Sequence, residues 1–129
     1  MGNRAVITNK AWDDIGIYLH WNGGRNSIEQ FLAYAKHHDI RDDDYGLASL
    51  VQIIGNFMGG TMSVGVGRLG KQDCNNYDNG TYWIKDWEIV DREFHEYEDG
   101  TPKPEQTGHE RELYKSVCEV NQYAFEVQY

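Results

Sequence analysis

Residues 15–30 read IGIYLHWNGGRNSIEQ, and this stretch decides the fold because a strand-like pattern changes there into a helical one. Apolar residues recur at every second position before the turn, as in a strand with one buried face. Gly23 and Gly24 then allow a tight turn, and Ser27 and Gln30 have the spacing of a capping box at a helix start. The stretch therefore predicts a strand that passes through a glycine turn directly into a helix.

The same turn is suited to hold a small anion. Arg25 follows the two glycines and stands beside the backbone N–H groups and the positive dipole end of the predicted helix. Phosphates and carboxylates bind in this arrangement. Any strand-to-helix connection also needs turn residues and a cap, so a purely structural role for the turn is the alternative interpretation.

Hydrophobic periodicity along the rest of the chain predicts an α+β domain with a mainly antiparallel sheet. The predicted strands cover 4–8 and 16–21 as a hairpin, a stretch after residue 61, 82–89 as one strand or two, and an edge strand over 94–97. The predicted helices cover 27–38, 44–58 and 108–127. Asp78, Asn79 and Gly80 form a typical hairpin-turn sequence. The resulting order is β-β-α-α-β-β-β-α, with two adjacent helices after the first hairpin and a C-terminal helix.

The length of 129 residues fits a single domain, 1–129. We expect an α+β body over 1–98, a loop over 99–107 that contains both prolines, and the C-terminal helix over 108–127. That helix has a narrow apolar stripe formed by Leu113, Val117, Val120, Ala124 and Val127. The stripe predicts an oligomer seam, and packing of the same residues against the sheet is the alternative.

The net charge of −9 is unevenly distributed along the chain. Residues 1–84 contain seven Lys or Arg against nine Asp or Glu, whereas residues 85–129 contain five against twelve. This acidity opposes binding to DNA or to an anionic membrane. A small anion is expected to bind in the first two thirds of the chain. The cysteines have no partner motif, and no signal or membrane-spanning pattern is present, so we expect a cytoplasmic protein.

The residue patterns of catalytic and metal sites do not occur in this sequence. There is no H-E-x-x-H, paired C-x-x-C or calcium-loop spacing, and no serine has a nucleophile-elbow context. Gly65, Gly67 and Gly70 have the spacing of a dinucleotide fingerprint, but no helix follows them. We therefore predict a protein that is not an enzyme and that uses neither a metal nor a cofactor.

Aromatic and polar residues near the glycine turn predict a nucleotide-type ligand. A base needs a ring on which to stack and amide or carboxylate groups at its edge, whereas a phosphate needs arginine and backbone N–H groups. The predicted ligand-binding residues are Arg4, Trp21, Asn22, Gly23, Gly24, Arg25, Phe57, Arg68, Asp78, Asn79 and Tyr82. Aromatic residues at these positions also suit a core, so burial is the alternative interpretation.

Four ordered motifs resemble a family of small proteins from phages and prophages of Gram-positive bacteria. They are MGNRAVIT (1–8), IYLHWNGG (17–24), IGNF (54–57) and DNGTY (78–82). The combination resembles the Thoeris anti-defence signal sponges, which sequester cyclic ADP-ribose isomers or, in some relatives, cyclic oligonucleotides. The resemblance implies a non-enzymatic α+β binder that forms dimers or hexamers. The glycine turn and Arg25 match motif positions, whereas the acidic C-terminal third is unexpected for a binder of anions.

The sequence therefore predicts a phage protein of the host cytoplasm that sequesters a cyclic nucleotide or cyclic ADP-ribose signal without degrading it. Arg25, helped by Arg4 or Arg68, would neutralise the pyrophosphate, an aromatic ring would stack on the base, and the amide or carboxylate side chains would hydrogen-bond to base or ribose. The alternative is an acidic protein-binding inhibitor that mimics nucleic acid and blocks a host nuclease or CRISPR effector. The net charge favours this alternative, whereas the glycine turn favours the sponge.

Overall fold

The computed structural model describes residues 3–74, 76, 78–93 and 105–122. The main elements are β1 (Ala5–Thr8), β2 (Ile15–Leu19), α1 (Arg25–His37), α2 (Asp44–Met58), β3 (Val64–Arg68), β4 (Thr81–Lys85), β5 (Glu88–Glu93) and α3 (Glu110–Asn121). Two short 3-10 helices, η1 (Lys10–Trp12) and η2 (Leu69–Lys71), follow β1 and β3. Their order confirms the predicted α+β class. The edge strand predicted over 94–97 and the helical residues predicted over 123–127 lie outside the described residues.

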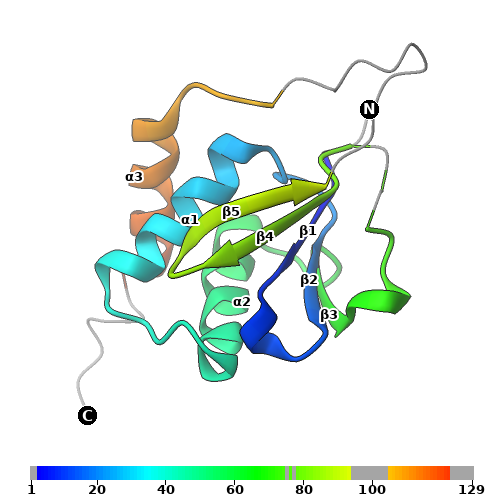
Figure 1. Ribbon diagram of the computed structural model, residues 1–129. Helices are drawn as coiled ribbons and strands as arrows, with labels where there is room; N and C mark the ends of the chain where they lie inside the picture. Colours follow the sequence, from blue (N-terminus) through cyan, green and yellow to red (C-terminus); the bar gives the residue numbers. More distant parts are fainter. Residues whose placement is uncertain (1–2, 75, 77, 94–104, 123–129) are drawn as a thin grey trace.

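The strands form one five-stranded sheet in the order β3-β2-β1-β4-β5 (Figure 1). All neighbouring strands are antiparallel except β1 and β4, which are parallel. β1 and β2 form the predicted hairpin. β1 nevertheless lies at the centre of the sheet, because β4 pairs with its free side and not with β3.

The helices lie together on one face of the sheet (Figure 1), and the core fills the space between them. Alternate residues of the central strands point into this core, namely Ala5, Ile7, Ile17, Leu19, Tyr82 and Ile84. The apolar stripes of α1 and α2 pack against them. On the opposite face, Gln72 lies against Gly16, where an added Cβ would come within 2.7 Å of the Gln72 Oε1 atom. Among the residues that the structure describes, no helix is both long enough and apolar enough to cross a membrane.

The prediction of a hairpin turn at Asn79 and Gly80 is wrong. β3 pairs with β2 and β4 pairs with β1, so the strands on the two sides of this turn are not partners. The hairpin instead joins β4 to β5 through Asp86 and Trp87, whose φ angles of 54° and 61° are typical of a type I′ turn. Trp87 tolerates this backbone because its indole is buried and donates a hydrogen bond to the Ile40 carbonyl at 2.8 Å.

α3 packs on α1 and α2, and part of its apolar stripe is used inside the chain. Val117 is 1 % exposed, whereas Val120 is 42 % exposed. Asn121 anchors the helix, because its Nδ2 atom donates to the carbonyls of Ile53 and Val117 and its Oδ1 atom accepts from Asn56. The stripe is therefore divided between internal packing and the surface.

Candidate functional site

The structure brings most of the predicted ligand residues to one end of the sheet, where β1 and β4 begin and β2 ends. Trp21, Asn22, Gly23, Gly24 and Arg25 lead from β2 into α1, while Arg4, Asp78, Asn79 and Tyr82 come from the starts of β1 and β4. Two predicted residues lie elsewhere. Phe57 packs edge-on against Phe31 within the helix layer, with ring centroids 5.3 Å apart, and Arg68 is exposed at the opposite end of β3.

The glycine turn approaches the chain's own first strand. The N–H of Gly23 donates to the Asn3 carbonyl at 2.8 Å, and a Cβ on Gly23 would lie 2.6 Å from the Cβ of Ala5. Gly24 is the N-cap of α1, so the capping box predicted at Ser27 is wrong. The Asn26 N–H donates to the Gln106 carbonyl at 3.0 Å. Backbone N–H groups that an anion was expected to use thus bind within the chain.

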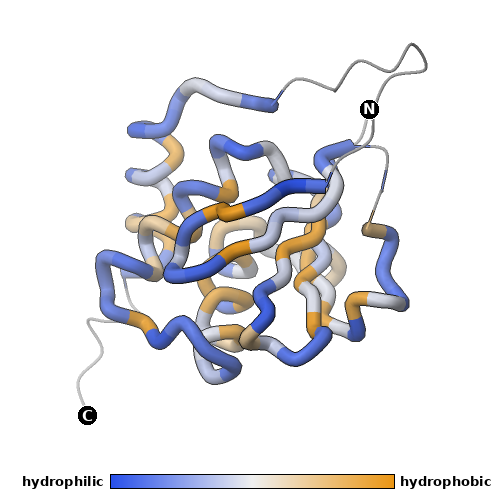
Figure 2. Tube along the Cα trace, in the orientation of Figure 1, coloured by the Kyte–Doolittle hydropathy of each residue, from blue (hydrophilic) through white to orange (hydrophobic). Residues whose placement is uncertain are grey.

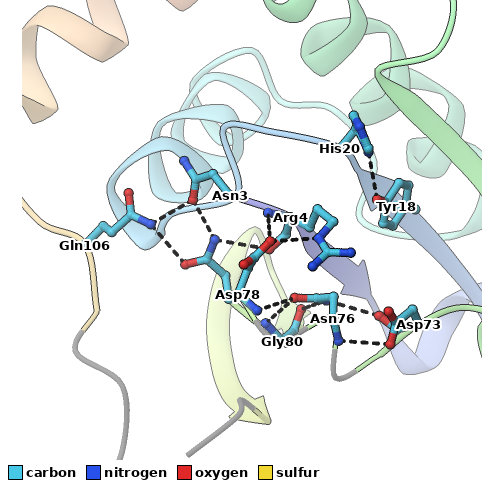
Figure 3. Close-up of polar contacts among 10 residues, drawn as sticks. Asn3, Arg4, Tyr18, His20, Asp73, Asn76, Asp78, Gly80 and Gln106 are labelled. Atoms are coloured by element: carbon cyan, nitrogen blue, oxygen red, sulfur yellow. Dashed lines mark hydrogen bonds and ion pairs between the residues drawn. The ribbon is translucent and has the colours of Figure 1, made fainter. Parts of the chain in front are cut away.

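A polar network connects this turn to three other segments. The Asn79 amide donates to Asn3 Oδ1 at 2.6 Å and to the Arg4 carbonyl at 3.1 Å. Gln106 Nε2 also donates to Asn3 Oδ1, at 2.7 Å (Figure 3). We call the residues Asn3, Gly23, Asn79 and Gln106 the glycine-turn end of the sheet. Their contacts give Asn79 a structural role in joining the starts of β1 and β4 to the segment before α3.

Arg4 is fixed on the side of the sheet opposite the helices. Its backbone N–H and its Nε atom both donate to Asp78 Oδ2, at 3.0 and 2.8 Å, and this contact raises the pKa of Arg4. Figure 3 shows Tyr18 and His20 beyond the Arg4 side chain, with the Tyr18 hydroxyl 2.9 Å from His20 Nδ1. Arg4 and Asp78 therefore form an internal ion pair whose cation stays partly exposed.

A carboxylate of the chain itself lies at the position predicted for an anionic ligand. Glu105 Oε2 is 2.8 Å from Arg25 Nη1, and Glu105 Oε1 is 3.2 Å from Arg92 Nη1. Partial burial opposes the charge on Arg25, but the carboxylates of Glu105 and Glu29 raise its pKa. The two arginines, one from the first turn of α1 and one from β5, thus contact different oxygens of the same carboxylate.

Tyr82 packs against Arg92 of this anion site, and its ring is not accessible for stacking on a base. Its side chain is fully buried, and its hydroxyl donates to the Gly23 carbonyl at 2.9 Å. The Arg92 guanidinium lies over the ring, 5.0 Å from its centroid. Burial raises the pKa of Tyr82, so the hydroxyl stays protonated and keeps donating. In this arrangement the ring positions Arg92.

Sequence reasoning missed both Arg92 and Glu105. On a regular strand, Ile89, Asp91 and Glu93 would share one face and Arg92 would point to the other. The register shifts from Trp83↔Asp91 to Ile84↔Ile89, so β5 contains a bulge that brings Arg92 opposite Tyr82. Glu105 belongs to the loop predicted over 99–107, where no local pattern distinguishes it from other acids. The predicted helix start was the one usable signal, because a helix N-terminus attracts a carboxylate.

A small cavity opens beside Arg25, between α1 and β5. Its volume is about 270 Å³. Leu32, Ala33 and Ile89 contribute apolar walls. The polar lining residues are Arg25, Lys36, His37, Glu29 and Glu88. The cavity therefore joins an apolar surface to the anion-binding arginine, which is the combination that a nucleotide requires.

A larger cavity of about 630 Å³ lies beside the β4–β5 hairpin and η1, and none of the predicted ligand residues lines it. Trp83 contributes an aromatic wall, and the charged lining residues are Lys10, Lys85, Asp42, Asp86, Asp91 and Glu93. Burial and the neighbouring Asp86 raise the pKa of Asp42. Because acids outnumber lysines here, this cavity is unsuited to a phosphate.

Comparison with protein-family models, curated proteins and solved structures finds no match to this chain. The resemblance to the Thoeris sponges therefore stays a prediction, and the argument for function rests on the geometry of the site. Within the described part of the chain, no group of three or more His, Cys, Asp or Glu side chains could hold a metal ion.

Proposed function

We propose that the protein sequesters a small phosphate-bearing signal, of the cyclic ADP-ribose or cyclic nucleotide class, at Arg25 and Arg92. The observation that supports this proposal is the Glu105 carboxylate held between the two guanidinium groups at 2.8 and 3.2 Å. Carboxylates and phosphates are both anions that pair with arginine through charged contacts of this kind. A ligand phosphate would therefore take the place of Glu105 and leave the two arginines where they are.

The cavity beside Arg25 would receive the base or ribose of this ligand. Its volume of about 270 Å³ lies just below the range of roughly 300–1,000 Å³ that is usual for small-molecule pockets. The ligand would therefore bind with one nucleoside inside and the remainder near the surface, where Lys36 and His37 could contact a second phosphate. Arginine stays protonated in proteins, so the pair is suited to holding charge and not to acid–base chemistry.

In an infected cell, the proposed function of such a site is to sequester the signal. A phage protein in the host cytoplasm that holds an immune signal would withdraw it from circulation. Slow dissociation would matter more than a fast association rate, because affinity differences between related sites arise mostly from dissociation rates. The exchange of Glu105 for a phosphate would provide the first contact, and burial in the cavity would provide the retention.

Calorimetric titration with cyclic ADP-ribose isomers and cyclic dinucleotides tests this proposal. We expect Arg25→Ala to weaken binding at least tenfold, which equals about 1.4 kcal/mol, because one of the two charged hydrogen-bond donors is lost. Glu105→Gln is expected to strengthen binding, because the competing carboxylate becomes neutral. Arg68→Ala is the matched control, since Arg68 is an exposed arginine at the far end of β3.

Mass spectrometry after heat release completes the test. Recovery of intact ligand supports sequestration, whereas a converted product would identify an enzyme. If neither the natural protein nor Glu105→Gln binds any of these nucleotides, the sponge proposal is wrong. Weaker binding in Glu105→Gln would show that Glu105 helps to build the site and does not compete for it.

A second candidate function is favoured by the larger cavity. Four carboxylates against two lysines, beside the Trp83 ring, would attract a basic protein surface, as the acidic nucleic-acid mimic requires. We expect Asp86→Asn combined with Asp91→Asn to abolish inhibition of a host nuclease or CRISPR effector while nucleotide binding stays unchanged. Inhibition that survives both substitutions would argue against this function.

A further inference from the structure

The edge strand β3 presents backbone groups that no strand of the described chain covers. β3 pairs with β2 alone. At the ends of this ladder, the N–H of His20 donates to the Ser63 carbonyl at 2.9 Å and the N–H of Leu69 donates to the Asp14 carbonyl at 2.8 Å. Alternate residues of an antiparallel strand bond to the same neighbour. Gly65 and Gly67 therefore bond to β2, and the backbone groups of Val64, Val66 and Arg68 point outward.

The side chains around this edge leave the backbone accessible and add apolar surface. Val66 is 53 % exposed, and Met62, just before the strand, is 85 % exposed. Gly65 has no side chain, and the nearest atom to an added Cβ would be 3.9 Å away. The edge has no acidic residue and no proline, which are common devices against strand-to-strand association. An edge strand with no acid and no proline, whose one charge is Arg68 at its end, is a template for another strand.

The opposite edge of the sheet differs in each of these respects. β5 reads EIVDRE, with charges at its beginning and over its last three residues. Figure 2 shows the end of this strand as hydrophilic. The bulge near Val90 also interrupts its ladder. β5 is therefore protected against pairing, and β3 is not.

The charge distribution identifies a second copy of this chain as the occupant of the β3 edge. Residues 45–72 contain no Asp or Glu, although the whole chain has a net charge of −9. Two copies that meet at β3 keep their acids away from the contact, because the charges of this segment are Arg68 and Lys71. We propose that β3 pairs antiparallel with β3 of a second copy, so that one continuous sheet crosses both.

A twofold axis at Val66 satisfies the outward backbone groups of this strand. It places Val66 opposite Val66 of the second copy, and Val64 opposite Arg68, so that like charges do not face each other directly. All three outward residues then occupy hydrogen-bonded positions, as a self-complementary interface requires. This surface differs from the seam predicted on the C-terminal helix. It is also independent of the proposed nucleotide site, whose arginines come from α1 and β5.

Sedimentation velocity of the full chain over a wide concentration range tests the interface. We expect the natural protein to form a dimer and Val66→Lys to raise its dissociation constant at least tenfold, because two ammonium groups would face each other across the axis. Val90→Lys is the matched control, since Val90 is 61 % exposed on the other edge strand, and it should dimerise like the natural protein. Val66→Pro should also dissociate the dimer, because it removes an N–H that points outward.

Far-ultraviolet circular dichroism of each variant separates loss of pairing from loss of folding. A Val66→Lys variant that fails to fold would be replaced by Val66→Pro, which keeps every hydrogen bond between β2 and β3. A natural protein that stays monomeric at all concentrations would overturn the proposal. A dimer that survives both Val66 variants but dissociates in Val120→Lys would also overturn it and would locate the interface on α3.

Discussion

The glycine-turn end of the sheet and the β3 edge use their polar groups in opposite ways. At the glycine-turn end, the Gly23 N–H and the amides of Asn79 and Gln106 bond within the chain. Along the β3 edge, the outward backbone groups have no neighbouring strand among the residues that the structure describes. The glycine turn, which is the most conspicuous motif of the sequence, therefore joins segments of the fold. The accessible polar groups lie instead on the less conspicuous strand β3. Glycine and asparagine turns are ambiguous because the groups that could bind a ligand can bind the chain equally well.

The largest difference between the two regions is expected for their arginines. Arg92 is 4 % exposed, contacts Glu105 and donates from Nε to the Asn79 carbonyl, which ties it to the glycine-turn end. Arg92→Ala should lower the free energy of unfolding by about 3 kcal/mol, because the charged hydrogen bond to the Asn79 carbonyl and the contact with the Tyr82 ring are lost together. Arg68→Ala on the β3 edge should change it by less than about 0.5 kcal/mol. Urea denaturation measures both, and equal effects would contradict the comparison.

The next largest difference in stability is expected between alanine substitutions of two glycines, Gly23 at the turn and Gly65 in β3. Gly23→Ala should destabilise the protein by about 1–3 kcal/mol, because the new Cβ would lie 2.6 Å from Ala5 Cβ and 2.7 Å from the Asn3 carbonyl oxygen. Gly65→Ala, with its nearest neighbour at 3.9 Å, should be neutral or stabilise by about 0.5 kcal/mol. Thermal melts of the two variants check this. A tolerated Gly23→Ala would show that the turn is looser than its contacts indicate.

The smallest expected effect concerns the Tyr82 hydroxyl. Tyr82→Phe should cost about 1 kcal/mol near neutral pH through the lost hydrogen bond to the Gly23 carbonyl. Burial raises the pKa of the folded Tyr82 above its ordinary value of 10.0. The unfolded chain therefore releases this proton at a lower pH than the folded protein does. The contribution of Tyr82 to the free energy of unfolding is fully present below pH 10 and decreases as the pH rises above it.

Urea titrations between neutral and alkaline pH test the Tyr82 effect. Burial and the neighbouring Cys118 raise the pKa of Tyr114 to about 12, so both proteins should lose some stability in base. The natural protein should lose more than Tyr82→Phe, and the gap between their unfolding free energies should narrow as the pH rises. Parallel curves would mean that Tyr82 ionises equally well in the folded state.

Within the described residues, hydrophobic periodicity was sufficient to predict the three helices and the approximate positions of the strands. α2 begins and ends at the predicted residues, because its apolar stripe is long and Gly59, with a φ of 69°, ends it. The pairing of the strands was harder, because the residues between β3 and β4 look like a hairpin turn. The local sequence does not reveal that β4 crosses to the free side of β1.

Most of the residues predicted to bind a ligand lie together at one end of the sheet, but their contacts with distant segments could not be predicted. Arg25 was predicted to bind a ligand anion, and in the structure it contacts the carboxylate of Glu105, 80 residues away. Arg92 reaches the site through a bulge, which depends on cross-strand register. Tyr82 and Asn79 were assigned to a ligand and are instead used by the fold. Contacts between distant segments account for each of these differences.

The central position of β1 also has a consequence for how the chain is made. β1 and β2 leave the ribosome early, but β1 finds its second neighbour only when Thr81, Tyr82 and Trp83 have followed. Pairings between residues far apart in sequence slow folding, because a long loop must close before they form. Until then Ala5 and Ile7, which are fully buried in the folded protein, lie on a strand that has β2 on one side and no neighbour on the other. While the segment between β2 and β4 is being made, one side of β1 is therefore open to other strands.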